Sequence, residues 1–268
     1  MAESVDKILG YTSTSGAEAG IEVGTGLALS TDNVLSGDAD SPGAVNEENI
    51  ELGQIRLTTS AATTVLQADA TEAWLIRQMI ITNTAGSTNV VSLYHDVDGT
   101  TYDDTTALIK GYSMPAGGVL NIDNIIVPLE NSTGALGLST SKSDVNFTAW
   151  GIKLAEANNT YKQLAQADSP TTAASLYTLP SGKKTVITGI FAANLGSSSR
   201  AQSIFWDEDG TTYDKTTAVH WELPIAGDEF VIFAEKKWLL ETTGGSLGHE
   251  GSVASAINTT LYGQEEDV

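Results

Sequence analysis

The hexapeptide DGTTYD occurs at residues 98–103 and again at residues 209–214, which is 209 − 98 = 111 positions later. A repeat this short has three explanations: chance, a metal-binding loop used twice, or duplication of a whole domain. The three explanations predict different proteins. The residues on either side of the two hexapeptides distinguish between them.

Further matches occur at the same offset. Asn83 in IITNTAGST aligns with Asn194 in FAANLGSSS, and LENSTGALG aligns with LETTGGSLG. After one inserted residue, NFTAWG at 146–151 aligns with NTTLYG at 258–263. Self-similarity at a fixed offset, on both sides of the hexapeptide, indicates an internal duplication.

Each copy contains runs rich in Val, Ile, Thr and aromatic residues. The runs are TTVLQA, WLIRQMIITN, NVVSLYHDV, ALIKGYSM, GVLNIDNIIV and VNFTAWGIKL in the first copy, and KTVITGIFAAN, AQSIFWDED, AVHWELP, EFVIFAEKKWLL and AINTTLYG in the second. Segments rich in Gly, Asn, Asp and Pro separate them, as in antiparallel sandwiches and barrels. The predicted fold is all-β: two tandem duplicated antiparallel β-sandwich domains, jelly-roll-like, preceded by an extended N-terminal arm.

The predicted domains are an extended acidic arm over residues 1–55, a first sandwich over 56–157, and a linker with the second sandwich over 158–268. Residues 1–50 hold nine acidic residues and a single Lys, and they have no counterpart in the repeat. A segment this polar has too little apolar surface for a core of its own. We therefore expect the arm to bind a partner surface.

Composition excludes several classes of protein. The 268 residues include 34 Asp and Glu against 13 Lys and Arg, a net charge of −21 that would repel nucleic acid. The chain has no cysteine, which excludes disulfides and Cys-ligated zinc. We see no signal peptide and no membrane span, and we expect no direct contact with nucleic acid or membrane.

The aspartates around each hexapeptide have the spacing of oxygen-ligand loops that hold Ca²⁺. The candidate metal ligands are Asp96, Asp98 and Asp103 in the first copy and Asp207, Asp209 and Asp214 in the second. The alternative is a strand-to-strand turn, because Asp-Gly is a strong turn signal and neither loop has the closing Glu of an EF-hand. We favour the turn, with no cofactor, and keep Ca²⁺ as the alternative.

No catalytic motif accompanies the remaining polar residues. His95, His220 and His249 are scattered, without a G-x-S-x-G or H-E-x-x-H pattern, so we predict that the protein is not an enzyme. The five tryptophans suit core or interface packing, with a sugar-binding platform as the alternative. The segment AEKKWLL at 234–240 is a candidate contact to an acidic neighbour, or an edge strand protected by lysines.

The order of these segments resembles the small β-sandwich modules of tailed-bacteriophage virion proteins. The resemblance rests on ITNTAGS, the DGTTY loop, PAGGVL, IIVPL and SKSDVNFTAWG, and it covers both copies but not the arm. The second copy departs from it at the PAGG turn, which reads PIAG at 224–227. That family implies a structural role in the virion, as a capsid decoration, head-fibre, tail or adaptor component.

The resemblance and the composition together predict a capsid decoration or cement protein that binds the shell through its arm. A tail, collar or adaptor protein of the virion is one alternative, and a carbohydrate-binding module for host attachment is another. The expected partners are the major capsid protein or other virion proteins and further copies of the chain, as a homo-oligomer. The expected location is the virion, assembled in the host cytoplasm.

Overall fold

The computed structural model describes residues 27–29, 35–37, 49–130, 133–233 and 238–268. The chain divides into two units, Met1–Glu47 and Glu48–Val268. In the first unit the described residues form two short antiparallel strands, β1 (Leu27–Leu29) and β2 (Leu35–Gly37). The rest of the predicted arm up to residue 48 lies outside the described residues, so the extended arm stays a prediction.

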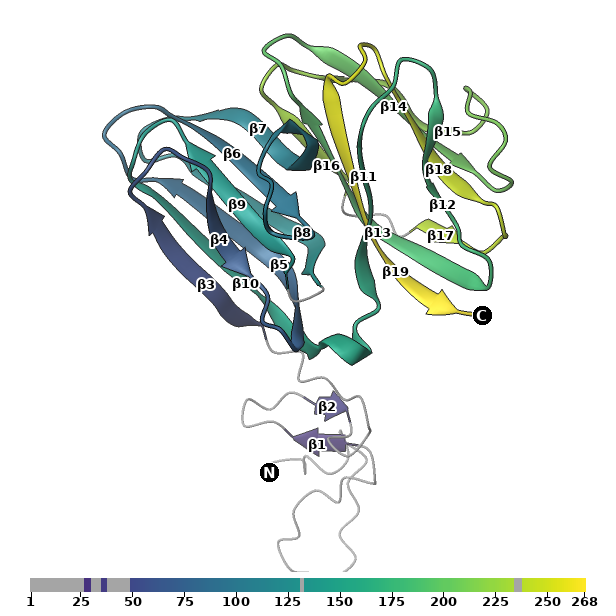
Figure 1. Cartoon of the computed structure of the whole chain (residues 1–268), viewed down its shortest axis with the longest axis horizontal. Helices are drawn as coiled ribbons and strands as arrows, with labels where there is room; N and C mark the ends of the chain where they lie inside the picture. The colour runs from purple at the N-terminus through teal and green to yellow at the C-terminus, as the bar shows by residue number, and fades with distance from the viewer. Residues whose placement is uncertain (1–26, 30–34, 38–48, 131–132, 234–237) are drawn as a thin grey trace, which may run out of the picture. The chain divides into compact units, whose positions relative to one another are not determined.

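The second unit has two lobes, which Figure 1 shows side by side. Lobe 1 contains β3 (Ile50–Leu57), β4 (Thr63–Gln67), β5 (Glu72–Asn83), β6 (Asn89–Asp96), the 3-10 helix η2 (Asp104–Thr106), β7 (Ala107–Met114), β8 (Val119–Leu129), β9 (Ala135–Thr140) and β10 (Val145–Ala155). The 3-10 helix η3 (Glu156–Asn158) leads to lobe 2, which contains β11 (Tyr161–Asp168), β12 (Ala174–Thr178), β13 (Lys183–Asn194), β14 (Arg200–Asp207), β15 (Ala218–Ile225), β16 (Phe230–Phe233), β17 (Trp238–Leu240), β18 (Ser246–Gly251) and β19 (Ile257–Asp267).

The strand order is the same in both lobes. Lobe 1 has the sheets β3-β10-β5-β8 and β4-β9-β6-β7, and lobe 2 has β11-β19-β13-β16, with β17 also paired to β13, and β12-β18-β14-β15. Counted from the first strand of each lobe, with β16 and β17 taken as one strand because both pair with β13, both orders read 1-8-3-6 and 2-7-4-5, which is jelly-roll connectivity. The predicted all-β, antiparallel fold is confirmed. Descent of the two lobes from one duplicated domain stays a prediction.

Strand β3 begins inside the segment predicted to be arm. Residues 50–57 pair with β10, from Ile50 opposite Gly151 to Leu57 opposite Val145. Leu52 and Leu57 are buried, so this strand contributes to the core of lobe 1. Strand β9 and its counterpart β18 were also not identified as strands from the sequence, because their Gly-containing segments have the composition of turns.

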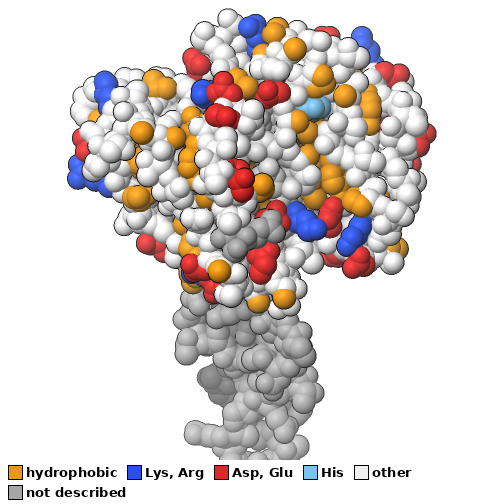
Figure 2. All heavy atoms as spheres, in the orientation of Figure 1, with side chains coloured by type: hydrophobic (Ala, Val, Ile, Leu, Met, Phe, Trp, Pro, Cys, Tyr) orange, Lys and Arg blue, Asp and Glu red, His pale blue; other side chains and the backbone are white. Residues whose placement is uncertain are grey.

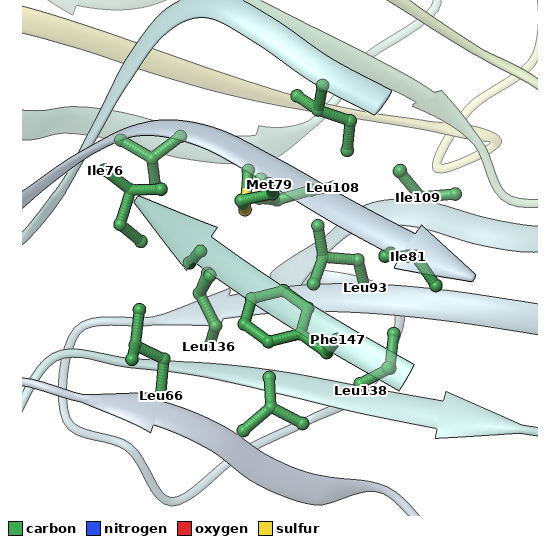
Figure 3. Close-up of a cluster of buried hydrophobic side chains, with 14 of the residues drawn as sticks. Leu66, Ile76, Met79, Ile81, Leu93, Leu108, Ile109, Leu136, Leu138 and Phe147 are labelled. Atoms are coloured by element: carbon green, nitrogen blue, oxygen red, sulfur yellow. The ribbon is translucent and has the colours of Figure 1, made fainter. Parts of the chain in front are cut away.

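The core of lobe 1 lies between its two sheets. Figure 3 shows Ile81 and Phe147 from one sheet meeting Leu93 and Leu138 from the other, and all four are fully buried. Burial of each such side chain stabilises the fold by about 1.5–3 kcal/mol. The two sheets are therefore the layers of one sandwich, held by a shared apolar core.

Asn83 holds the end of β5 against the turn that connects β7 to β8. Its Nδ2 donates to the main-chain carbonyls of Ser87, Met114 and Pro115 at 2.9, 3.0 and 2.9 Å, and the side chain is fully buried. Asn194 makes the corresponding three bonds in lobe 2. The Asn pair that aligns in the sequence thus has the same structural role in each lobe.

Candidate functional site

Both DGTTYD segments form loops whose aspartates accept hydrogen bonds from their own main chain. In lobe 1, Asp96 Oδ2 accepts from the amides of Thr100 and Thr101. Asp98 and Asp103 each accept from the amide two residues further on, at 3.0 and 2.9 Å. Asp103 thereby caps η2. These are the local bonds that make Asp a turn-forming residue.

The loop of lobe 2 repeats this pattern. Asp207 Oδ2 accepts from the amide of Thr212, and Asp209 and Asp214 each accept from the amide two residues further on, at 3.0 and 2.7 Å. The glycine of each loop has a left-handed backbone, with φ of +69° at Gly99 and +70° at Gly210. Glycine adopts this conformation without steric cost, which accounts for its place in both hexapeptides.

The tyrosine of each loop packs on a glycine of the neighbouring strand. A Cβ at Gly137 would overlap the ring of Tyr102, and a Cβ at Gly248 would overlap the ring of Tyr213. The Tyr102 hydroxyl also lies 2.7 Å from Thr64 Oγ1, and the Tyr213 hydroxyl bonds a serine of β18. The final glycine of the repeated L-E-x-x-x-G-x-L-G spacing is therefore required by the loop that packs over it.

The six aspartates proposed as metal ligands serve first as hydrogen-bond acceptors. Bonds from the threonine two residues on hold the pKa of Asp98, Asp103, Asp209 and Asp214 below the ordinary value. Within the described ranges, no three His, Cys, Asp or Glu side chains are grouped so that they could hold a metal ion. Calcium binding at these loops stays a prediction.

The three histidines lie on different strands with different partners. His95 is fully buried against Tyr262, and His220 stacks on Phe233 with ring centres 4.3 Å apart. His249 is buried in lobe 2, where its Nδ1 lies 3.3 Å from Ser169 Oγ. Because Ser169 is itself fully buried, this Ser–His pair does not face a substrate from solvent.

The tryptophans do not form a flat exposed platform within the described residues. Trp74 is buried, Trp221 is 40% exposed, and Trp150, Trp206 and Trp238 are half-buried. The rings of Trp206 and Trp238 are inclined at 61°, so they are not coplanar. A sugar platform needs neighbouring rings that share one plane, and this geometry does not favour the carbohydrate-binding alternative.

A pocket of about 200 Å³ lies on lobe 2, lined by Ala201, Ser203, Trp221, Glu222, Glu250, Gly251 and Ser252. Glu222 has a left-handed backbone with φ of +48°, at the position where lobe 1 has Gly111 with φ of +71°. An aromatic face beside two carboxylates suits a cationic group. Lys215 of the same chain already lies over the Trp221 ring, with Nζ 4.9 Å from the ring centre.

The two lobes meet in a buried joint, formed by β7, β8 and η2 on one side and by β11, β13, β16 and β19 on the other. Phe191 and Tyr262 extend from lobe 2 into the core of lobe 1, where both are fully buried and meet edge to face. Tyr112 and Phe230 meet edge to face at 5.8 Å. Aromatic pairs of this kind favour one geometry over others, so the joint is specific.

Polar contacts add to the joint. His95 Nδ1 lies 2.8 Å from the Tyr262 hydroxyl, Asn258 Nδ2 donates to two carbonyls of η2, and Glu130 accepts from the amide of Gln163 at 2.8 Å. Burial lowers the pKa of His95 to about 3 and raises the pKa of Glu130 to about 6. Both groups are therefore driven towards their neutral forms.

Sequence reasoning assigned no role to these joint residues. One signal was present: the unbroken apolar run GIFAA in β13 predicts a strand covered on both faces, whereas a sandwich strand exposed on one side alternates. The candidate contact in AEKKWLL was placed at 234–240, and its residues 234–237 lie outside the described residues. On the face shown in Figure 2, acidic side chains are scattered over both lobes.

The described part of the chain contains no helix long and apolar enough to cross a membrane.

No family model matches the chain, and no curated protein matches it. Among solved structures it is similar to the STIV MCP, with a TM-score of 0.30 and 10% identity over 81% of this chain and 95% of that one. It is similar to Broad Bean Stain Virus, with a TM-score of 0.32 and 7% identity over 90% and 95%. It is similar to the PBSX exported protein XepA, with a TM-score of 0.26 and 13% identity over 82% and 86%. Scores this low assign neither a family nor a function to the chain.

Proposed function

We propose that this chain is a non-enzymatic structural protein of a virion, and more specifically a decoration protein of the capsid. The observation that carries the proposal is the pair of lobes with jelly-roll connectivity, fused into one compact unit by a buried joint. A unit of this kind presents a large fixed surface and suits a role in assembly. Jelly rolls occur in viral capsid proteins and also in lectins, so the fold alone does not decide the function.

The use of the polar residues supports a structural role. The aspartates of the DGTTYD loops bond their own main chain, and the buried histidines bond neighbouring side chains in the joint and in lobe 2. The sequence resemblance to tailed-bacteriophage sandwich modules supports the virion assignment.

We propose that the N-terminal segment supplies the attachment to the shell. Residues 1–50 are acidic, lack a counterpart in the repeat and are too polar to form a core. A segment that becomes ordered along a shell subunit buries a large area per residue and adds stability without chemistry. The net charge of −21 keeps such a protein soluble before assembly. A tail or collar location is the alternative, and it differs in copy number.

The test is the copy number of this chain in purified particles of the virus that encodes it, measured by quantitative mass spectrometry against the most abundant shell protein. A decoration protein gives a ratio near one or a simple fraction of one. A ratio on the order of a hundredth places the chain at the tail or collar, because a tail ring holds far fewer subunits than a shell. Absence from the particles rejects the virion assignment.

A further inference from the structure

The joint between the lobes uses two different surfaces, and each lobe carries both. The first, the edge surface, consists of β7, β8 and η2 in lobe 1 and of the corresponding β15, β16, β17 and Asp214–Thr217 in lobe 2. The second, the sheet face, is the outward side of β11-β19-β13-β16 in lobe 2 and of β3-β10-β5-β8 in lobe 1. β8 and β16 are outermost strands, so each contributes its free edge to the edge surface and its outward side to the sheet face. The joint combines the edge surface of lobe 1 with the sheet face of lobe 2, which leaves the sheet face of lobe 1 and the edge surface of lobe 2 outside it.

The edge surface of lobe 2 exposes apolar positions that are buried in lobe 1. Leu108 is fully buried, whereas its counterpart at 108 + 111, Val219, is 38% exposed. Leu239 is 45% exposed on the same edge. Exposed apolar side chains on the strands of one edge make that edge a candidate interaction surface.

The sheet face of lobe 1 presents the matching positions. Val119 is 62% exposed. It is the counterpart of Phe230, since 230 − 111 = 119, and Phe230 packs on Tyr112 in the joint. Trp150 is half-buried and is the counterpart of Tyr262, since the offset after the inserted residue is 112 and 262 − 112 = 150. Both faces therefore have an apolar residue at the two places where the joint has its aromatic contacts.

A polar group at the sheet face of lobe 1 also lacks a partner. Asn146 stands at 258 − 112, the position of Asn258, which donates to the carbonyls of Asp104 and Thr105 in the joint. Asn146 Oδ1 is buried without a hydrogen-bond partner among the described residues. A buried amide of this kind costs about 1–3 kcal/mol until a partner arrives. In the proposed contact the carbonyls of Lys215 and Thr216, the counterparts of those of Asp104 and Thr105, accept from Asn146 Nδ2, whereas Oδ1 requires a separate donor.

We propose that a second copy of this chain docks its lobe 1 sheet face onto the lobe 2 edge surface, repeating between chains the joint that the lobes make within one chain. The occupant is a copy of this chain because the joint itself shows that an edge surface and a sheet face of this type fit together. The contact joins two different surfaces, so it is head-to-tail and produces a ring or an open row of subunits.

Charge sets the conditions for this contact. Each copy carries a net charge of −21, so two copies repel each other at low ionic strength. In the contacting turn, Lys215 replaces Asp104 and adds a positive charge to the edge surface of lobe 2. Association therefore strengthens when salt is raised from about 0.02 M to about 0.3 M, over which the Debye length falls well below the size of the protein.

The test is sedimentation velocity of the full chain with two variants. Val119→Glu blocks the sheet face, and Val219→Glu blocks the edge surface; both side chains are exposed enough for the fold to tolerate the change. The wild type is expected to form oligomers whose size grows with concentration, and each variant alone is expected to associate at least about tenfold more weakly. An equal mixture of the two variants is expected to give dimers, since each pair retains one intact edge surface and one intact sheet face.

Val90→Glu and Val253→Glu are the matched controls, because these valines are 39% and 41% exposed and belong to neither surface. They are expected to associate like the wild type. A wild-type chain that stays monomeric across the salt range overturns the proposal. So does a mixture of the two blocked variants that remains monomeric, or a control that weakens association equally. The test uses purified chain alone, so its failure is separate from failure of the virion assignment.

Discussion

His95 and Tyr262 are 167 positions apart in the sequence, yet Nδ1 of the one lies 2.8 Å from the hydroxyl of the other in the joint between the lobes. Both side chains are fully buried. This contact ties β6 of lobe 1 to β19, the last strand of lobe 2. The stability of each lobe is therefore linked to that of the other, and the joint is a natural place to test the structure.

The buried histidines predict that stability falls in acid. Burial lowers the pKa of His95 from 6.5 to about 3 and that of His249 from 6.5 to about 4. The folded state holds both in the neutral form, so their contribution is complete above pH 6.5 and is lost as the pH falls towards these values. As the pH falls through that window, each histidine reduces the free energy of unfolding by up to about 1.4 kcal/mol per pH unit. Urea titrations at several pH values measure it.

His249→Leu supplies the control for this prediction, since the corresponding residue of lobe 1 is the buried Leu138. The variant is expected to lose the titration of one histidine, so its stability falls less steeply with acid than that of the wild type. Equal slopes for the two proteins would contradict the assignment of the acid sensitivity to buried histidine.

Glu130 predicts an effect of opposite sign. Its raised pKa, from 4.5 to about 6, favours the protonated form in the folded state, so the stability it contributes is present below pH 4.5 and is lost as the pH rises through 6. Glu130→Gln keeps the acceptor for the Gln163 amide and removes the buried charge. The variant is expected to be more stable than the wild type by about 1–2 kcal/mol at pH 8 and to match it near pH 4. A variant that is less stable at pH 8 would show that the charge is favourable.

Asn83→Ala tests the attachment of the β7–β8 turn. The substitution removes the buried donor of three carbonyls, of which that of Met114 is buried, and we expect a loss of about 2–4 kcal/mol in the free energy of unfolding. Asn194→Ala is expected to cost a similar amount, because the same three bonds exist in lobe 2. Thr84→Ala is the nearby control, since the Thr84 side chain is exposed and makes a single side-chain hydrogen bond to the carbonyl of Asp144. A loss below about 0.5 kcal/mol at Asn83 would refute this role.

Chelation distinguishes the two interpretations of the DGTTYD loops. Because their aspartates are already bonded to the loop main chain, the melting temperature is expected to be the same in excess EDTA and in 1 mM Ca²⁺, a concentration of about the highest Kd of extracellular calcium modules. If calcium bound the folded protein tightly, added calcium would raise the melting temperature. Such a rise, abolished by Asp98→Asn and Asp209→Asn together, would restore the calcium interpretation.

Removal of Met1–Glu47 tests the proposed attachment to the shell. Strand β3 begins at Ile50, so the truncated chain keeps every strand of both lobes and is expected to give the circular dichroism spectrum of a β protein. Incorporation into particles is expected to fall below detection, as measured by mass spectrometry of purified virions. A truncated chain that incorporates normally would mean that the lobes themselves hold the shell.

Two kinds of information account for what could be predicted. The sequence alone determined the all-β class, because alternating apolar residues and Asp-Gly or Gly-rich turns act over a few neighbouring positions. It also determined the offset of 111, because the repeated segments align directly with each other. It also paired Asn83 with Asn194, whose equivalent bonds the structure then showed. Strand β3 was missed because its sequence, IELGQIRL, contains a glycine and charged residues and adjoins the acidic segment, so residues 50–55 were grouped with the arm.

Tertiary structure decided the joint and the choice between its surfaces. The two lobes share their strand order, yet Tyr262 is buried against His95 while its counterpart Trp150 is only half-buried. Local patterns can show that a strand has apolar residues on both faces, but which apolar face meets which depends on how complete lobes fit together. The sequence by itself therefore determined the all-β class of each lobe. Only the packing of one folded lobe on the other decided which of their similar surfaces became buried and which stayed exposed. That packing depends on contacts between residues more than a hundred positions apart, which local patterns do not specify.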